Sequence, residues 1–188
     1  MNKLRLPATL LLFALIALIV QSCNKDSVTG IGYTTAPYQA NIDGTTWVPD
    51  TANMALAYNS ATGTKTLSFV GQKNTRQVLF SVSIPNTNTT GFPLNTYNID
   101  SVKVTAQYNA QQKNGSGQYV FTPQGTVGPN SGSIIVTAID SVKKQITGTF
   151  SFLSRSTVYD GSGNVLYTTV HNITAGAFTS VPYTFTSN

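Results

Sequence analysis

Short runs of alternating apolar and polar residues constrain the fold of this chain more than any other feature. In residues 77–84, for example, Val78, Phe80 and Val82 fall on one side of an extended strand, and most of their neighbours are polar. A period of two residues is typical of a half-buried β-strand. Pro85 ends the run, because proline lacks the N–H that a strand ladder requires.

About ten such strands follow one another at intervals of roughly 8–15 residues, and no helical period is present after residue 36. Glutamate is absent and only 9% of the residues are charged, so strong helix formers are scarce. The spacing predicts an antiparallel β-sandwich, with a small β-barrel as the alternative. The twelve segments from which these strands are expected are residues 38–42, 45–48, 54–58, 66–70, 77–84, 96–99, 102–108, 119–122, 133–139, 145–153, 165–171 and 177–185.

Several single residues predict local details of these strands. Asp43-Gly44 between two short strands indicates a tight hairpin, because a type I′ turn needs positive φ at both positions. Trp47 just after it is expected to pack in the core. Gly148 within a strand indicates a bulge or a close backbone approach, and Pro182 indicates a strand edge or end.

The N-terminal residues have the pattern of a secretory signal. Lys3 and Arg5 precede an apolar run at residues 10–20, and small or polar residues follow. The alternative is a retained transmembrane helix, but a span needs about 20 apolar residues and this run is shorter. We therefore expect residues 1–22 to be a signal peptide that is removed.

Residues 20–23, Val-Gln-Ser-Cys, resemble a bacterial lipobox, in which the cysteine becomes the lipidated first residue. Gln21 departs from the small residue that is commoner at its position. The expected organisation is a lipidated Cys23 with a flexible tether to residue 36, followed by a single all-β domain at residues 37–188. Cys23 is the only cysteine, so no intramolecular disulfide can form and the core alone must stabilise the domain.

Five segments carry a resemblance to a known family: residues 42–47, 95–97, 131–137, 146–152 and 173–178. Together they resemble a family of small Bacteroidetes lipoproteins with an all-β domain of unknown function. The resemblance implies an outer-membrane protein, lipid-anchored and exposed either to the periplasm or to the cell surface. It implies no catalytic residue, cofactor or ligand.

The chemically reactive residues give no catalytic pattern. All six acidic residues precede Gly, Ser or Thr, as turn residues do. His171 is the only histidine, which makes a zinc site improbable and leaves a Ser-His-Asp hydrolase as the alternative function. The net charge of +5 is scattered, so nucleic-acid binding is not expected. We expect neither an enzyme nor a cofactor or metal.

Four Asp-Ser/Thr-aliphatic triplets resemble acceptors for bacterial O-glycosylation, and turns that lead into strands explain the same triplets equally well. The possible glycosylation sites are Ser27, Thr51, Ser101 and Ser141.

The main functional hypothesis is a binding or interaction module whose long loops recognise a glycan or another envelope protein, with Tyr side chains available for stacking. The oligomeric state and the ligand are left open.

Overall fold

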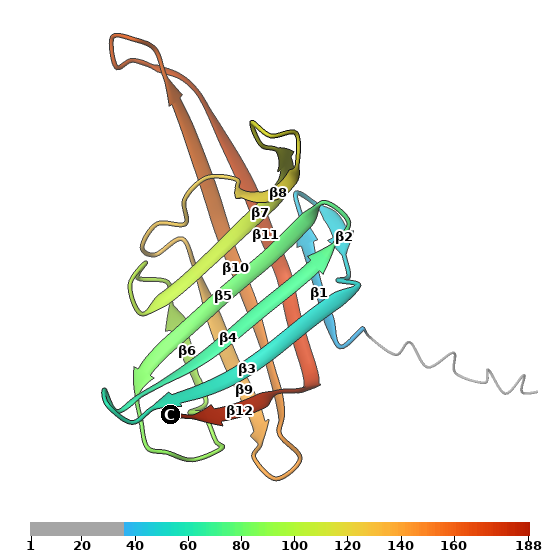
Figure 1. Ribbon diagram of the computed structural model, residues 1–188, viewed down its shortest axis with the longest axis vertical. Coiled ribbons are helices and arrows are strands. Elements are labelled where there is room, and N and C mark those ends of the chain that lie inside the picture. Colours follow the sequence, from blue (N-terminus) through green and yellow to red (C-terminus); the bar gives the residue numbers. More distant parts are fainter. Residues whose placement is uncertain (1–35) are drawn as a thin grey trace, which may run out of the picture. The chain divides into compact units, whose positions relative to one another are not determined.

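The computed structural model describes residues 36–188 (Figure 1). The predicted signal peptide, the lipidated Cys23 and all but the last position of the tether lie outside the described residues. The described residues belong to one compact unit, which contains twelve β-strands and no helix. Among the described residues there is therefore no apolar helix that could span a bilayer.

The strands form two six-stranded sheets that pack as a sandwich, so the predicted fold is confirmed and the barrel alternative is wrong. Every strand pair is antiparallel except β12 with β3, which is parallel. The first sheet has the order β2 (Thr45–Trp47), β1 (Tyr38–Ile42), β11 (Val165–Pro182), β10 (Gln145–Tyr159), β9 (Gly132–Asp140) and β6 (Asn95–Asn98). The second has the order β12 (Thr184–Ser187), β3 (Thr51–Asn59), β4 (Thr64–Lys73), β5 (Arg76–Pro85), β7 (Val104–Lys113) and β8 (Tyr119–Pro123).

The core lies between the two sheets and is rich in aromatic rings. Phe69 and Phe80 of the second sheet contact each other, with ring centroids 5.1 Å apart, and both contact Phe150 of the first sheet, at 5.9 and 5.3 Å. Each buried ring contributes about 1.5–3 kcal/mol, and each aromatic pair adds about 0.5–1.5 kcal/mol. Trp47 is buried, as predicted. This core explains how the domain is held together without a disulfide.

Two predictions about single residues are confirmed. Asp43 and Gly44 have φ angles of 53° and 77° and form the two-residue turn between β1 and β2. Gly148 lies at a register shift in β10, and a Cβ added there would be 2.1 Å from the Ile135 carbonyl oxygen. Only glycine therefore lets β9 and β10 approach each other at this point.

The C-terminal strands differ from the prediction. Residues 165–171 and 177–185 were expected to be separate strands, but β11 runs without interruption from Val165 to Pro182. The residues between the two expected strands belong to β11, although the register is irregular there and Ala175 has a φ of 48°. Pro182 ends β11, as expected, and β12 follows in the opposite sheet.

β10 and β11 extend well beyond the sandwich as a two-stranded hairpin (Figure 1). We call residues 156–169 the arm. An isolated bridge between Thr126 and Arg155 joins the body of the domain to the base of the arm. Figure 1 shows the arm projecting beyond the ends of the other strands.

The arm and the start of the domain lie at opposite ends of the first sheet. Tyr38, at the start of β1, pairs with Phe178, whereas the β1–β2 turn lies beside Asn172 at the base of the arm. Val165, where β11 begins next to the arm tip, is 13 residues from Phe178, which corresponds to about 43 Å.

Candidate functional site

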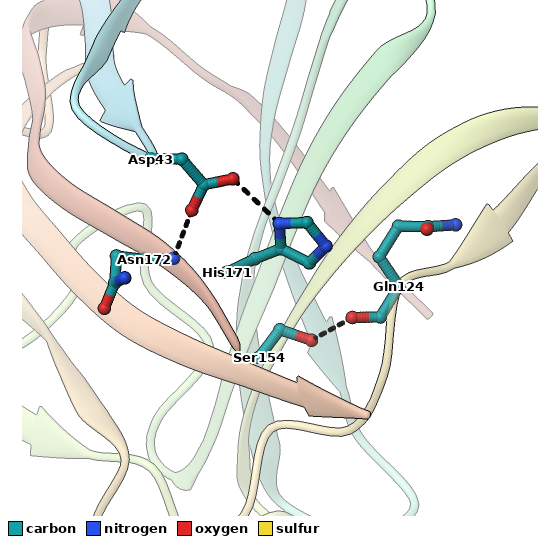
Figure 2. A network of polar contacts seen from close by, with 5 residues as sticks. All are labelled: Asp43, Gln124, Ser154, His171 and Asn172. Carbon is teal, nitrogen blue, oxygen red and sulfur yellow. Dashed lines mark hydrogen bonds and ion pairs between the residues drawn. The ribbon is translucent and has the colours of Figure 1, made fainter. Parts of the chain in front are cut away.

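The base of the arm holds a polar network centred on Asp43 (Figure 2). The turn presents the Asp43 carboxylate to β11, where Oδ2 lies 2.8 Å from Nδ1 of His171. The Asn172 N–H donates to Asp43 Oδ1 over 2.8 Å, and the Asp43 N–H donates to the Asn172 carbonyl over 2.9 Å. The network ties the β1–β2 turn to the point where β11 leaves the sandwich.

The surroundings of Asp43 favour its carboxylate form. Burial raises the pKa of Asp43, but hydrogen bonds from His171 and Asn172 outweigh it and hold the pKa below its ordinary value. The positive charge of Arg76 acts in the same direction. The edge of the Tyr108 ring packs against the imidazole with centroids 5.0 Å apart, so His171 is held from two sides.

The predicted hydrolase would require a serine hydroxyl directed at His171. Ser154 is the cross-strand partner of His171, but it is fully buried and its hydroxyl donates to the Gln124 carbonyl over 2.8 Å. Figure 2 shows this hydroxyl pointing at Gln124. A buried hydroxyl that is bonded to a carbonyl cannot attack a substrate, so these contacts favour a structural role for His171. The expectation that the chain is not an enzyme stays a prediction.

A groove runs along the outer side of β10, between the base of the arm and the loop at residues 125–131. It consists of two adjoining hollows of about 390 and 370 Å³, which share Thr126 and Arg155. Volumes of this size are common in small-molecule sites. We call it the arm groove. Its lining includes Thr126, Asn130, Ser131, Arg155, Ser156 and Tyr159.

The arm groove combines three kinds of side chain. Arg155 supplies a permanent positive charge, and no acidic residue lines either hollow. Hydroxyl and amide groups offer hydrogen bonds, and the ring of Tyr159 is 58% exposed at the outer end. Such a lining suits a polar, anionic ligand with a flat face that can stack on a ring.

The comparisons identify the family. A family model of a domain of unknown function, DUF6252, matches residues 34–182, which include strands β1–β11, the arm and the arm groove. The chain belongs to the DUF6252 family. No curated protein and no solved structure matches it. The predicted domain of unknown function is confirmed, whereas the lipoprotein and Bacteroidetes assignments stay predictions.

Three of the five predicted modification sites lie in the described part of the DUF6252 domain. Cys23 and Ser27 lie outside the described residues. Thr51, Ser101 and Ser141 are all exposed, at the start of β3 and in two turns, and the Ser101 hydroxyl donates to the Val127 carbonyl. Exposure meets the first requirement for glycosylation, which itself stays a prediction.

The turns that contain Ser101 and Ser141 are formed by the aspartates before them. Asp100 Oδ1 accepts hydrogen bonds from the N–H groups of the residues two, three and four positions later. Asp140 Oδ1 accepts them from the residues two and three positions later. Backbone hydrogen bonds hold the pKa of both carboxyls below the ordinary value. These aspartates are turn residues, as the sequence predicted. Among residues 36–188, no three His, Cys, Asp or Glu side chains are grouped as a metal site would require.

Sequence reasoning missed a buried lysine in the DUF6252 domain. Lys65 is fully buried, and its Nζ donates to the Gly91 carbonyl over 2.7 Å and to Thr89 Oγ1 over 2.9 Å. Burial lowers its pKa. Lys65 thereby fixes the loop at residues 86–94 over one end of the core. No pattern in the sequence indicates this role, because lysine beside a turn is ordinarily a surface residue.

Proposed function

We propose that this DUF6252 protein is a lipid-anchored envelope protein that binds an acidic glycan in the arm groove. The observation that carries the proposal is the position of Arg155, a cation without an acidic neighbour in a polar groove beside an exposed aromatic ring. The guanidinium can bind a carboxylate or sulfate through two parallel hydrogen bonds. The ring of Tyr159 offers a stacking surface for a sugar.

The proposed anchor suits this site. A lipid on Cys23 would hold the protein at a membrane, and the chain would enter the sandwich at Tyr38. Because the arm lies at the opposite end of the first sheet, its groove would be directed away from the point of attachment. A glycan of the envelope or of the surroundings would then reach the groove without a clash with the bilayer.

The proposal is tested with the full chain in mild detergent by isothermal titration calorimetry. The probes are trigalacturonate, a hyaluronan tetrasaccharide, a heparin-derived tetrasaccharide and, as the neutral control, maltotriose. We expect at least one acidic probe to bind and maltotriose to bind at least tenfold more weakly. The proposal fails if no acidic probe binds, or if the neutral probe binds equally well.

Two substitutions assign the binding to the arm groove. Arg155→Gln should weaken binding of the acidic probe about tenfold or more, since a charge-assisted hydrogen bond contributes about 1.5–3 kcal/mol. The strand bridge to Thr126 uses only backbone atoms of Arg155 and survives the substitution. Lys143→Gln is the matched control, because it removes the same charge from an exposed turn at the other end of β10. Equal losses in both variants would indicate non-specific charge attraction and refute the assignment.

A further inference from the structure

The arm leaves one edge of β11 without a partner strand. β1 pairs with β11 only as far as Ile173, and between Val165 and Val170 the only partner of β11 is β10. Within residues 36–188 no other element pairs with this edge. An unpaired edge is a ready template for another strand.

The hydrogen-bonding groups at this edge are directed outward. The N–H and carbonyl of Asn172 face away from β10, because both bond to Asp43. Peptide directions alternate along an antiparallel strand, so the peptide groups of Val170 and Thr168 face the same open edge. A strand laid beside the arm would find these donors and acceptors in register.

The side chains of residues 165–170 are uncharged and exposed, and four of the six are large and apolar. Leu166 and Tyr167 are 61% and 59% exposed, and residues 165–170 carry no charge. A two-stranded hairpin in water is marginally stable by itself, and additional strands stabilise it. The arm therefore has both the need for another strand and the surface that one would cover.

We propose that the open edge of the arm pairs with the same edge of a second copy of this chain, in an antiparallel dimer with twofold symmetry. The neutrality of residues 165–170 means that two identical strands meet without charge repulsion. The open edge is bounded by Asn172, which is bonded to Asp43, and by the turn at the arm tip, where the Asn164 N–H donates to Asp160. The four strands of two arms would then form one continuous sheet.

The symmetry fixes the register of the pair. With the twofold axis at Thr168, Leu166 lies opposite Val170 of the second copy, and the same contact occurs twice. Tyr167 lies opposite Thr169 of the second copy on the other face. An aliphatic pair on one face and an aromatic–β-branched pair on the other are favourable cross-strand combinations. Thr168 itself lies opposite Thr168 of the second copy.

This register makes position 168 the most sensitive one for charge. In Thr168→Lys two ammonium groups would face each other across the axis, and in Thr168→Glu two carboxylates would do so. Neither variant should form a homodimer, whereas the Lys and Glu variants together should form a heterodimer. The mixture also reports on folding, because pairing requires two intact arms.

The test uses full chains that carry one of two affinity tags, co-expressed and extracted in mild detergent. We expect wild-type copies to co-purify, the Thr168→Lys pair to fall to less than a tenth of that yield, and the Lys–Glu mixture to return to at least half. Ser162→Lys, which places the same charge in the turn at the tip, should co-purify as the wild type does. Failure of wild-type copies to co-purify would overturn the dimer, and failure of the mixture to recover would overturn this pairing.

The dimer and the glycan site are independent. The arm groove lies on the β10 side and the proposed interface on the β11 edge. A monomeric protein that still binds the acidic probe would refute the dimer alone. A dimer that binds no acidic probe would refute the proposed function alone.

Discussion

Substitution of Gly148 by alanine tests the packing of the sandwich at its tightest point. The added Cβ would lie 2.1 Å from the Ile135 carbonyl oxygen and 2.3 Å from Cζ of Phe178, whereas ordinary contacts begin near 3.4 Å. One neighbour is the backbone of β9 and the other is a fully buried ring, so neither can move without cost. The substitution must therefore separate β9 from β10 or displace Phe178.

The expected loss follows from these two routes. Overpacking of a core costs about 1–3 kcal/mol, and complete loss of a buried phenylalanine costs about 3–5 kcal/mol. Removal of a glycine from a strand returns about 0.5–1 kcal/mol through the unfolded state. We therefore expect a net loss of about 2–3 kcal/mol in the free energy of unfolding.

The measurement is urea unfolding followed by tryptophan fluorescence, because Trp47 is the only tryptophan and is buried. With a slope of about 2 kcal/mol per molar urea, the midpoint should fall by about 1 M or more. Gly161→Ala is the control, since nothing lies within 4 Å of its Cβ position, and its midpoint should stay within about 0.3 M. Equal midpoints for Gly148→Ala and the wild type would refute the close approach of β9 and β10.

Four further predictions concern charge, loop order and the anchor. Asp43→Asn should lower the free energy of unfolding at pH 7 by at most about 1 kcal/mol, because the carboxylate and its hydrogen bonds are partly exposed. The difference should vanish in urea titrations as pH falls through the lowered pKa of Asp43. Burial raises the pKa of Tyr38 to about 12, so the folded state keeps a proton that the unfolded state loses above pH 10; Tyr38→Phe should therefore reduce the loss of stability between pH 10 and 12. Lys65→Met should increase hydrogen exchange at residues 87–92, whose order rests on its two hydrogen bonds, and unchanged exchange would contradict that role. Labelled palmitate should enter the wild type and not Cys23→Ser, and equal labelling of the two would refute the anchor.

The strands were predictable because their signal is local. Alternation placed Val78, Phe80 and Val82 in the core, and all three are buried. The Asp43-Gly44 turn and the close approach at Gly148 were predictable because each depends on a conformation or a distance that few residues permit. These features involve the residue and its immediate neighbours, which a single sequence contains.

The arm was not predictable, because alternation looks the same whether or not another strand covers it. Residues 165–170 have the pattern of an ordinary strand, and their exposure depends on where β1 and β9 end. The pair of Asp43 and His171 joins residues 128 positions apart, so no spacing rule finds it. The arm groove likewise requires the loop at residues 125–131 to lie beside β10.

Hydrogen–deuterium exchange of the full chain, with and without the tightest-binding acidic oligosaccharide, tests the proposed function most directly. The account predicts that the ligand slows exchange at residues 125–131 and 153–159, and that Arg155→Gln raises the ligand concentration needed for this protection about tenfold or more. Protection elsewhere, for example at residues 86–94 alone, or no change at any residue on saturation, would contradict a glycan site in the arm groove.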